Sequence, residues 1–124
     1  MTAVAAGLCA SGAAVAADRD ESAAREYVYC GRIVAALESA YELAGRADGV
    51  RAFRAMRGFF VMAATVRSDG EFMKLEIERS SQRFKERFSG RDVPAENKEL
   101  TSEGERCLEL FDTEVKPLLG LKKM

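Results

Sequence analysis

The chain has 124 residues, a formal net charge of −1 and 48% apolar side chains, a composition typical of one globular domain. It contains no histidine and three cysteines, which excludes histidine-based catalysis, histidine-bearing metal or haem sites and a four-thiolate zinc or iron–sulfur site. The balanced charge also gives no overall attraction to nucleic acid. We therefore expect no enzymatic activity, no cofactor, no metal site and no nucleic-acid partner.

Residues 1–17 are uncharged and rich in alanine. Ala14 and Ala16 form an A-x-A cleavage signal, which would leave Ala17 as the first mature residue. The stretch is weakly hydrophobic and lacks the basic residues of a typical signal, so the alternative is the tail of a cytoplasmic protein. It is shorter than the ~20 apolar residues that cross a bilayer, so no membrane span is expected. We predict an atypical signal peptide over 1–17, a periplasmic or secreted location, and a single helical domain over 18–124.

A helix is predicted over residues 21–45, because apolar side chains recur there at alternating intervals of three and four residues. The stripe consists of Tyr27, Cys30, Val34, Leu37, Tyr41 and Ala44. Glu38 lies off this stripe. Tyr27 and Tyr41 are expected in the core with their hydroxyls at its rim, whereas Tyr29 is a candidate surface contact.

A second helix is predicted over residues 50–66. Its buried side is formed by Val50, Phe53, Met56, Phe60, Ala63 and Ala64. Arg51, Arg54 and Arg57 lie on another side. The run 59–64 is apolar nearly all round, so we expect the second half of this helix to be enclosed on most sides. A short buried strand is the competing interpretation, but the continuous pattern and the flanking alanines favour a helix.

A third helix is predicted over residues 69–88. Ser68 and Glu71 have the spacing of a capping box, in which each side chain accepts from the other residue's backbone N–H. The residues expected to be buried are Met73, Ile77, Phe84 and Phe88. Ser80 or Ser81 falls in the middle of this stripe.

A fourth helix is predicted over residues 96–118, where Ser102 and Glu105 form another candidate capping box. Its apolar stripe contains Leu100, Gly104, Cys107, Phe111, Val115 and Leu118. Four amphipathic helices joined by short connections, with no strand signal, predict an all-α fold, namely an antiparallel four-helix bundle.

Two cysteines remain once the predicted leader, which contains Cys9, is removed. Cys30 and Cys107 lie on the core stripes of the first and last helices, which are neighbours in a common bundle topology. An even pair of cysteines in an exported domain indicates one disulfide. The alternative is two buried thiols that behave as small apolar residues. A redox role is less favoured, because the chain has no C-x-x-C motif.

Arg51, Arg54 and Arg57 recur every third residue and share one broad side of their helix, here called the arginine face. Guanidinium groups suit phosphate, lipid headgroups and acidic segments, so the arginine face is a candidate anion-binding site. The alternative is structural pairing, either with the acidic fourth helix or with Glu38 and Glu42.

Other catalytic arrangements find no support, because no carboxylate pair stands on an apolar stripe where burial would raise its pKa. We therefore predict a small exported, disulfide-linked helical protein that binds another protein and has no catalytic activity. The alternative is a helical bundle, located in the cytoplasm, that binds an anion or a lipid headgroup through the arginine face.

Overall fold

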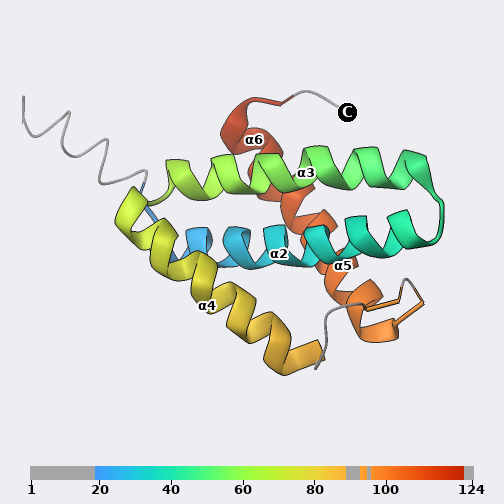
Figure 1. The fold of residues 1–124 in the computed structure, drawn as a ribbon. Helices are drawn as coiled ribbons and strands as arrows, with labels where there is room; N and C mark the ends of the chain where they lie inside the picture. Colours follow the sequence, from blue (N-terminus) through green and yellow to red (C-terminus); the bar gives the residue numbers. More distant parts are fainter. Residues whose placement is uncertain (1–18, 89–92, 95, 122–124) are drawn as a thin grey trace, which may run out of the picture.

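The computed structural model describes residues 19–88, 93–94 and 96–121, and within these ranges it contains helices and no strand (Figure 1). The helices are α2 (Glu21–Leu43), α3 (Ala47–Val66), α4 (Gly70–Phe88) and α5 (Lys98–Leu110), the last continuing through the π-helical turn η1 (Phe111–Val115) into α6 (Lys116–Leu119). This arrangement confirms the predicted all-α fold with four long helical segments. The predicted signal peptide lies outside the described residues.

Helix α2 is the centre of the fold and contacts α3, α4 and α5. Figure 1 shows α2 and α3 side by side and running in opposite directions, whereas α4 leaves the end of α3 and crosses α2 obliquely. The segment from α5 to α6 crosses behind α2 and α3 in the same view. Because α4 packs against α2 and diverges from α3, these two neighbours of α2 stay apart along most of their length.

The first turns of α4 and α5 are capped by residues other than those predicted. Asp69 caps α4 by accepting from the backbone N–H of Phe72 at 2.9 Å, while the Ser68 hydroxyl donates to a carbonyl in the last turn of α3. Asn97 caps α5 in the same way, so Ser102 lies inside the helix. Both predicted capping boxes are therefore wrong. In both helices an aspartate or asparagine side chain accepts the hydrogen bond from the first turn that was predicted for a serine.

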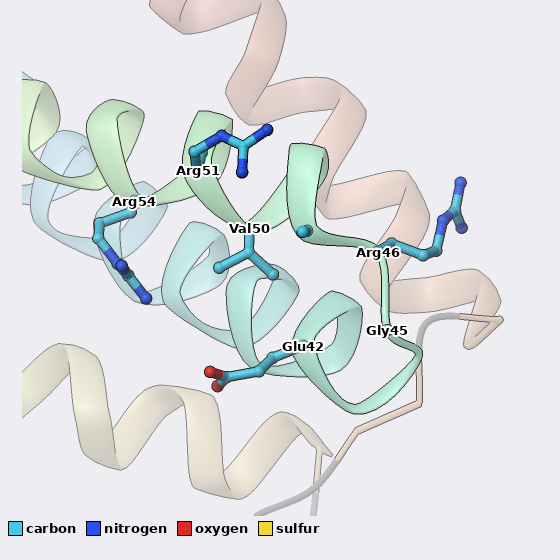
Figure 2. Close-up of a pocket in the computed structure, with 7 residues that line it drawn as sticks. Glu42, Gly45, Arg46, Val50, Arg51 and Arg54 are labelled. Carbon is cyan, nitrogen blue, oxygen red and sulfur yellow. The ribbon is translucent and has the colours of Figure 1, made fainter.

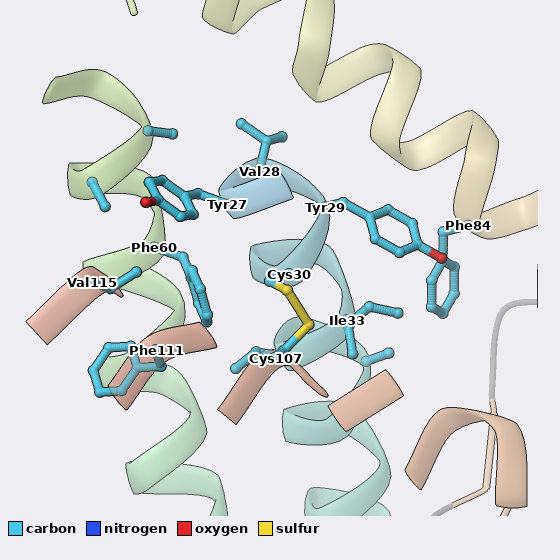
Figure 3. Close-up of a cluster of buried hydrophobic side chains, with 14 of the residues drawn as sticks. Tyr27, Val28, Tyr29, Cys30, Ile33, Phe60, Phe84, Cys107, Phe111 and Val115 are labelled. Carbon is cyan, nitrogen blue, oxygen red and sulfur yellow. A yellow bond between two sulfur atoms is a disulfide. The ribbon is translucent and has the colours of Figure 1, made fainter. Parts of the chain in front are cut away.

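The core is centred on the two cysteines that were predicted to pair. Cys30 on α2 and Cys107 on α5 are fully buried, and their sulfur atoms lie at disulfide bonding distance with the Cα atoms 5.5 Å apart. Figure 3 shows this disulfide between aromatic rings, with Phe60 and Phe111 on one side and Phe84 on the other. The disulfide thus joins α2 to α5 among aromatic side chains from α3, α4 and η1.

Three predicted positions on the core boundary are wrong. Ala44 was placed on the apolar stripe of residues 21–45, but it is the exposed residue that directly follows α2. Tyr29 was a candidate surface contact, but its side chain is fully buried. Ile77 was expected in the core, but it is 51% exposed, and the neighbouring Glu76 and Ser80 are buried instead. The physical reason is that α4 crosses α2 obliquely, so the side of α4 that faces α2 is rotated away from its most apolar stripe.

The second half of α3 is also less enclosed than predicted. Val61, Met62 and Val66 are 45%, 52% and 42% exposed, although Phe60, Ala63 and Ala64 on the inner side are fully buried. This difference follows from the divergence of α4, which leaves one flank of α3 uncovered.

Gly49 in the first turn of α3 is packed against the ring of Tyr41. A Cβ atom at position 49 would overlap this ring, which is held by an edge-on contact with Phe53 and by the Arg46 guanidinium 4.4 Å from its centroid. We expect Gly49→Ala to lower the free energy of unfolding by about 1–3 kcal/mol, the usual cost of overpacking. Denaturant unfolding measures this effect.

Gly58 provides the matched control, because it lies in the same helix and a Cβ atom there would meet nothing within 4 Å. Gly58→Ala should raise the free energy of unfolding by up to about 1 kcal/mol through helix propensity alone. Equal effects of the two substitutions would contradict the close packing of Tyr41 on α3.

Candidate functional site

The arginine face is largely engaged in ion pairs. Arg54 donates through Nε to Glu38 at 2.9 Å, and Arg57 Nη2 lies 3.3 Å from the other carboxylate oxygen of Glu38. Arg51 instead pairs with Asp48 within the same helix. The structure therefore brings Arg54 and Arg57 together on one acid of α2 and keeps Arg51 apart from them. This is the pairing with Glu38 that was the structural alternative to anion binding.

Glu38 is one of three buried glutamates, each of which lies next to two arginines. The other pairs are Glu76 with Arg25 and Arg79, and Glu103 with Arg87 and Arg106. Glu38 was expected to lie off the buried stripe of its helix, but it is 8% exposed, so that expectation was wrong. A buried carboxylate is strongly unfavourable unless it is paired. The side chains of these arginines are partly exposed, so they reach the carboxylate from the rim of the core. The pairs link α2 to α3, α2 to α4 and α4 to α5.

A hollow of about 360 Å³ lies at the turn between α2 and α3, and it includes part of the arginine face. Its charged lining residues are Glu42, Arg46, Arg51 and Arg54. Figure 2 shows that the guanidinium groups of these arginines point in different directions, that of Arg46 away from the others. The cations surround this hollow without converging on one point inside it.

A second hollow, of about 450 Å³, lies where α2 meets the π-helical turn η1. Tyr27 is 2% exposed, and its hydroxyl donates to Glu114 of η1 at 2.7 Å, which confirms Tyr27 as a core residue with its hydroxyl at the rim. Burial and then the hydrogen bond to the Glu114 carboxylate raise the pKa of Tyr27 to about 12. The Arg67 side chain also lines this hollow.

The raised pKa of Tyr27 predicts a loss of stability in alkali. The folded protein keeps the phenolic proton of Tyr27 to higher pH than the unfolded chain does. The stabilisation that comes from this protonated hydroxyl is therefore complete below about pH 10 and is lost as the pH rises to about 12. Two pKa units correspond to about 2–3 kcal/mol. We expect the free energy of unfolding to fall by about this amount relative to Tyr27→Phe, measured by denaturant unfolding across that range. An identical pH dependence in the two proteins would contradict the assignment.

A third hollow, of about 220 Å³, is an apolar groove between α3 and α4 with α2 as its floor. Val28, Gly31 and Ala35 of α2 form the floor, and Val61 of α3 and Ile77 of α4 form the walls. The two wall residues are about half exposed. We call this site the α3–α4 groove, and it is the most apolar of the three hollows.

The α3–α4 groove was not predicted from the sequence, because Val61 and Ile77 were expected to be enclosed in the core. One signal could have indicated it. Gly31 and Ala35 are small residues four positions apart on α2, outside the main apolar stripe, and such a spacing lets another helix approach the backbone closely.

Among the residues that the structure describes, no helix combines the length and the apolar character needed to span a bilayer. The same residues contain no cluster of three cysteine or acidic side chains that could hold a metal ion. No protein-family model matches the chain, and no curated protein or solved structure shows a significant similarity to it.

Proposed function

We propose that this chain is a small exported, disulfide-linked helical protein without catalytic activity, which binds another protein through the α3–α4 groove. The observation that carries this proposal is the groove itself, in which Val61 and Ile77 are half exposed on either side of an apolar floor. An apolar hollow bordered by exposed apolar side chains is typical of a binding site.

Export is supported by two independent features. Disulfides persist in oxidising compartments and are rare in the cytoplasm, and Cys30 and Cys107 lie at disulfide bonding distance in the core. The uncharged stretch over residues 1–17 with Ala14 and Ala16 is the second feature.

A non-catalytic role is supported by the state of the buried acids. Glu38, Glu76 and Glu103 would be the natural candidates for acid–base chemistry, but each lies within 4 Å of two arginine side chains. Such pairs compensate the charge of the buried carboxylate and hold it in place. These acids are therefore structural in this proposal.

Intact mass of the protein isolated from its native cell tests the export part. A mass that starts at Ala17 or Asp18 and rises by about two daltons on reduction is expected, since reduction of a disulfide adds two hydrogens. A full-length mass that reduction leaves unchanged would place the protein in the cytoplasm and remove the proposal of export.

A photo-crosslinking residue at position 77 tests the binding part. We expect one discrete adduct in intact cells from position 77, because Ile77 forms a wall of the α3–α4 groove. Position 75 is the matched control, since Leu75 is 56% exposed on the same helix and does not line the groove. Adducts of equal yield at both positions, or none at 77, would contradict a binding site in the groove.

A second candidate is a bundle that binds an anion or a lipid headgroup at the turn between α2 and α3. The hollow of about 360 Å³ lined by Arg46, Arg51 and Arg54 is the observation in its favour. Substitution of Arg51, Arg54 and Arg57 by glutamate should abolish binding to vesicles that contain an anionic phospholipid. Unchanged vesicle binding in this variant would remove the candidate.

A further inference from the structure

One cation in the α3–α4 groove has no acidic partner in the part of the chain that the structure describes. Arg32 of α2 lines the groove, and its guanidinium lies 4.1 Å above the centroid of the Phe84 ring. No carboxylate within residues 19–88, 93–94 and 96–121 forms an ion pair with it. Burial lowers the pKa of the Arg32 guanidinium, as expected for a cation that has lost water without gaining an anion. Arg106 of α5, outside this groove, is a contrast, because it pairs with Glu103.

The same groove contains a buried hydroxyl without a partner. Ser80 of α4 is 3% exposed, and its Oγ has no hydrogen-bond partner among the described residues. Buried hydroxyls are almost always hydrogen-bonded, and an unsatisfied one costs free energy in the folded state. The Ser80 hydroxyl and the Arg32 guanidinium are therefore both hydrogen-bond donors in the groove for which the described residues provide no acceptor.

The floor of the α3–α4 groove has the spacing of a surface on which helices pack. Its floor follows one stripe of α2, formed by Val28, Gly31, Arg32 and Ala35 at positions i, i+3, i+4 and i+7. The small side chain of Ala35 permits close approach of a second backbone, whereas a Cβ atom at Gly31 would meet Phe60 of α3 at 3.7 Å. The walls come from two helices that diverge. A helix placed here would bury an amphipathic face in the groove, as in other helix-in-groove complexes.

We propose that the α3–α4 groove receives an amphipathic helix of a partner protein, and that an acidic side chain of this helix binds Arg32 and Ser80. This inference rests on the proposed function and adds the chemistry of the partner. The apolar face of the helix contacts Val61 and Ile77, and the carboxylate accepts from the guanidinium and the hydroxyl. Arg57 at the same groove is already paired with Glu38, so Arg32 is the cation that selects the acid.

The test uses displayed helical peptides and the full, disulfide-oxidised chain. The library has leucine at positions i, i+3, i+4 and i+7 of a four-turn helix, with Glu, Gln, Lys or Ser at the remaining positions. We expect enrichment of glutamate at one position beside the leucine face. Binding of the enriched peptide should fall at least tenfold with Arg32→Gln and several-fold with Ser80→Ala, and should stay unchanged with Leu75→Ser.

Three outcomes would overturn the inference. One is enrichment without a preferred glutamate, and another is an enriched peptide whose binding is insensitive to Arg32→Gln. The third is that dodecanoate, but no peptide, shifts the backbone amide resonances of Arg32 and Ile77, which would make the ligand a free carboxylic lipid. Arg32→Lys, which keeps the cation, should retain more binding than Arg32→Gln, and equal unfolding midpoints of the two variants exclude a folding defect.

The proposed function can fail or survive separately from this inference. A discrete crosslink at position 77 in cells together with peptides that lack a glutamate preference would keep the binding site and reject the acidic partner. Absence of the crosslink together with glutamate-dependent peptide binding would reject the cellular role of the groove but keep its ligand chemistry.

Discussion

Substitution of Cys30 and Cys107 by alanine is expected to lower the free energy of unfolding by about 2–4.5 kcal/mol. The two residues are 77 positions apart, and their disulfide closes most of the domain into one loop. Cross-linking a loop of this length removes much of the conformational freedom of the unfolded chain, which accounts for the upper figure. Both side chains are fully buried between α2 and α5, so the variant also loses packing. Denaturant unfolding of both proteins measures the difference.

Two controls accompany this experiment. Cys9→Ala in the full-length chain removes a cysteine that takes no part in the disulfide, and it should leave the unfolding midpoint unchanged. Addition of a reductant to the wild-type protein should reproduce the loss seen in the double variant. A wild-type midpoint that is insensitive to reductant would mean that Cys30 and Cys107 are two buried thiols, which was the alternative interpretation of the sequence.

Phe60→Ala is expected to lower the free energy of unfolding by about 3–5 kcal/mol, the usual cost of removing a buried phenylalanine ring. Phe60 is fully buried, and its ring centroid lies 5.6 Å from that of Phe111 and 6.5 Å from that of Tyr27. Figure 3 shows that it fills the space between α3 and the disulfide. The cavity left by alanine would therefore adjoin α2, α3 and η1 together, where little can move to fill it. Thermal and denaturant unfolding measure the loss.

Met62 is the matched control on the same helix, because it is apolar, only two positions away and 52% exposed. Met62→Ala should change the free energy of unfolding by no more than about 0.5 kcal/mol, as is usual for exposed positions. A loss from Met62→Ala as large as that from Phe60→Ala would show that the outer side of α3 is covered in solution.

The four helical segments and the centre of the core follow directly from the amino-acid pattern. In each helix the apolar residues, such as Tyr27 and Cys30 in α2 and Phe60 in α3, recur at intervals that bring them to one side of that helix. Burial of that side is the main favourable term in folding. The cysteine partners could also be named, since both lie on such stripes. For the arginine face, the pattern left two interpretations open, because a guanidinium suits an external anion and a neighbouring carboxylate equally well.

The edges of each buried stripe depend on how the helices cross. Periodicity orients a helix about its own axis, but it contains no information about the angle at which a neighbour packs. The oblique path of α4 across α2 exposes Ile77 and buries Glu76, and arginines from two helices make that burial tolerable. The same path leaves the space between α3 and α4 unfilled. The α3–α4 groove, which contains Arg32 and Ser80, is thus a result of how three helices pack together. No local sequence preference determines that packing, so only the tertiary structure could reveal the groove.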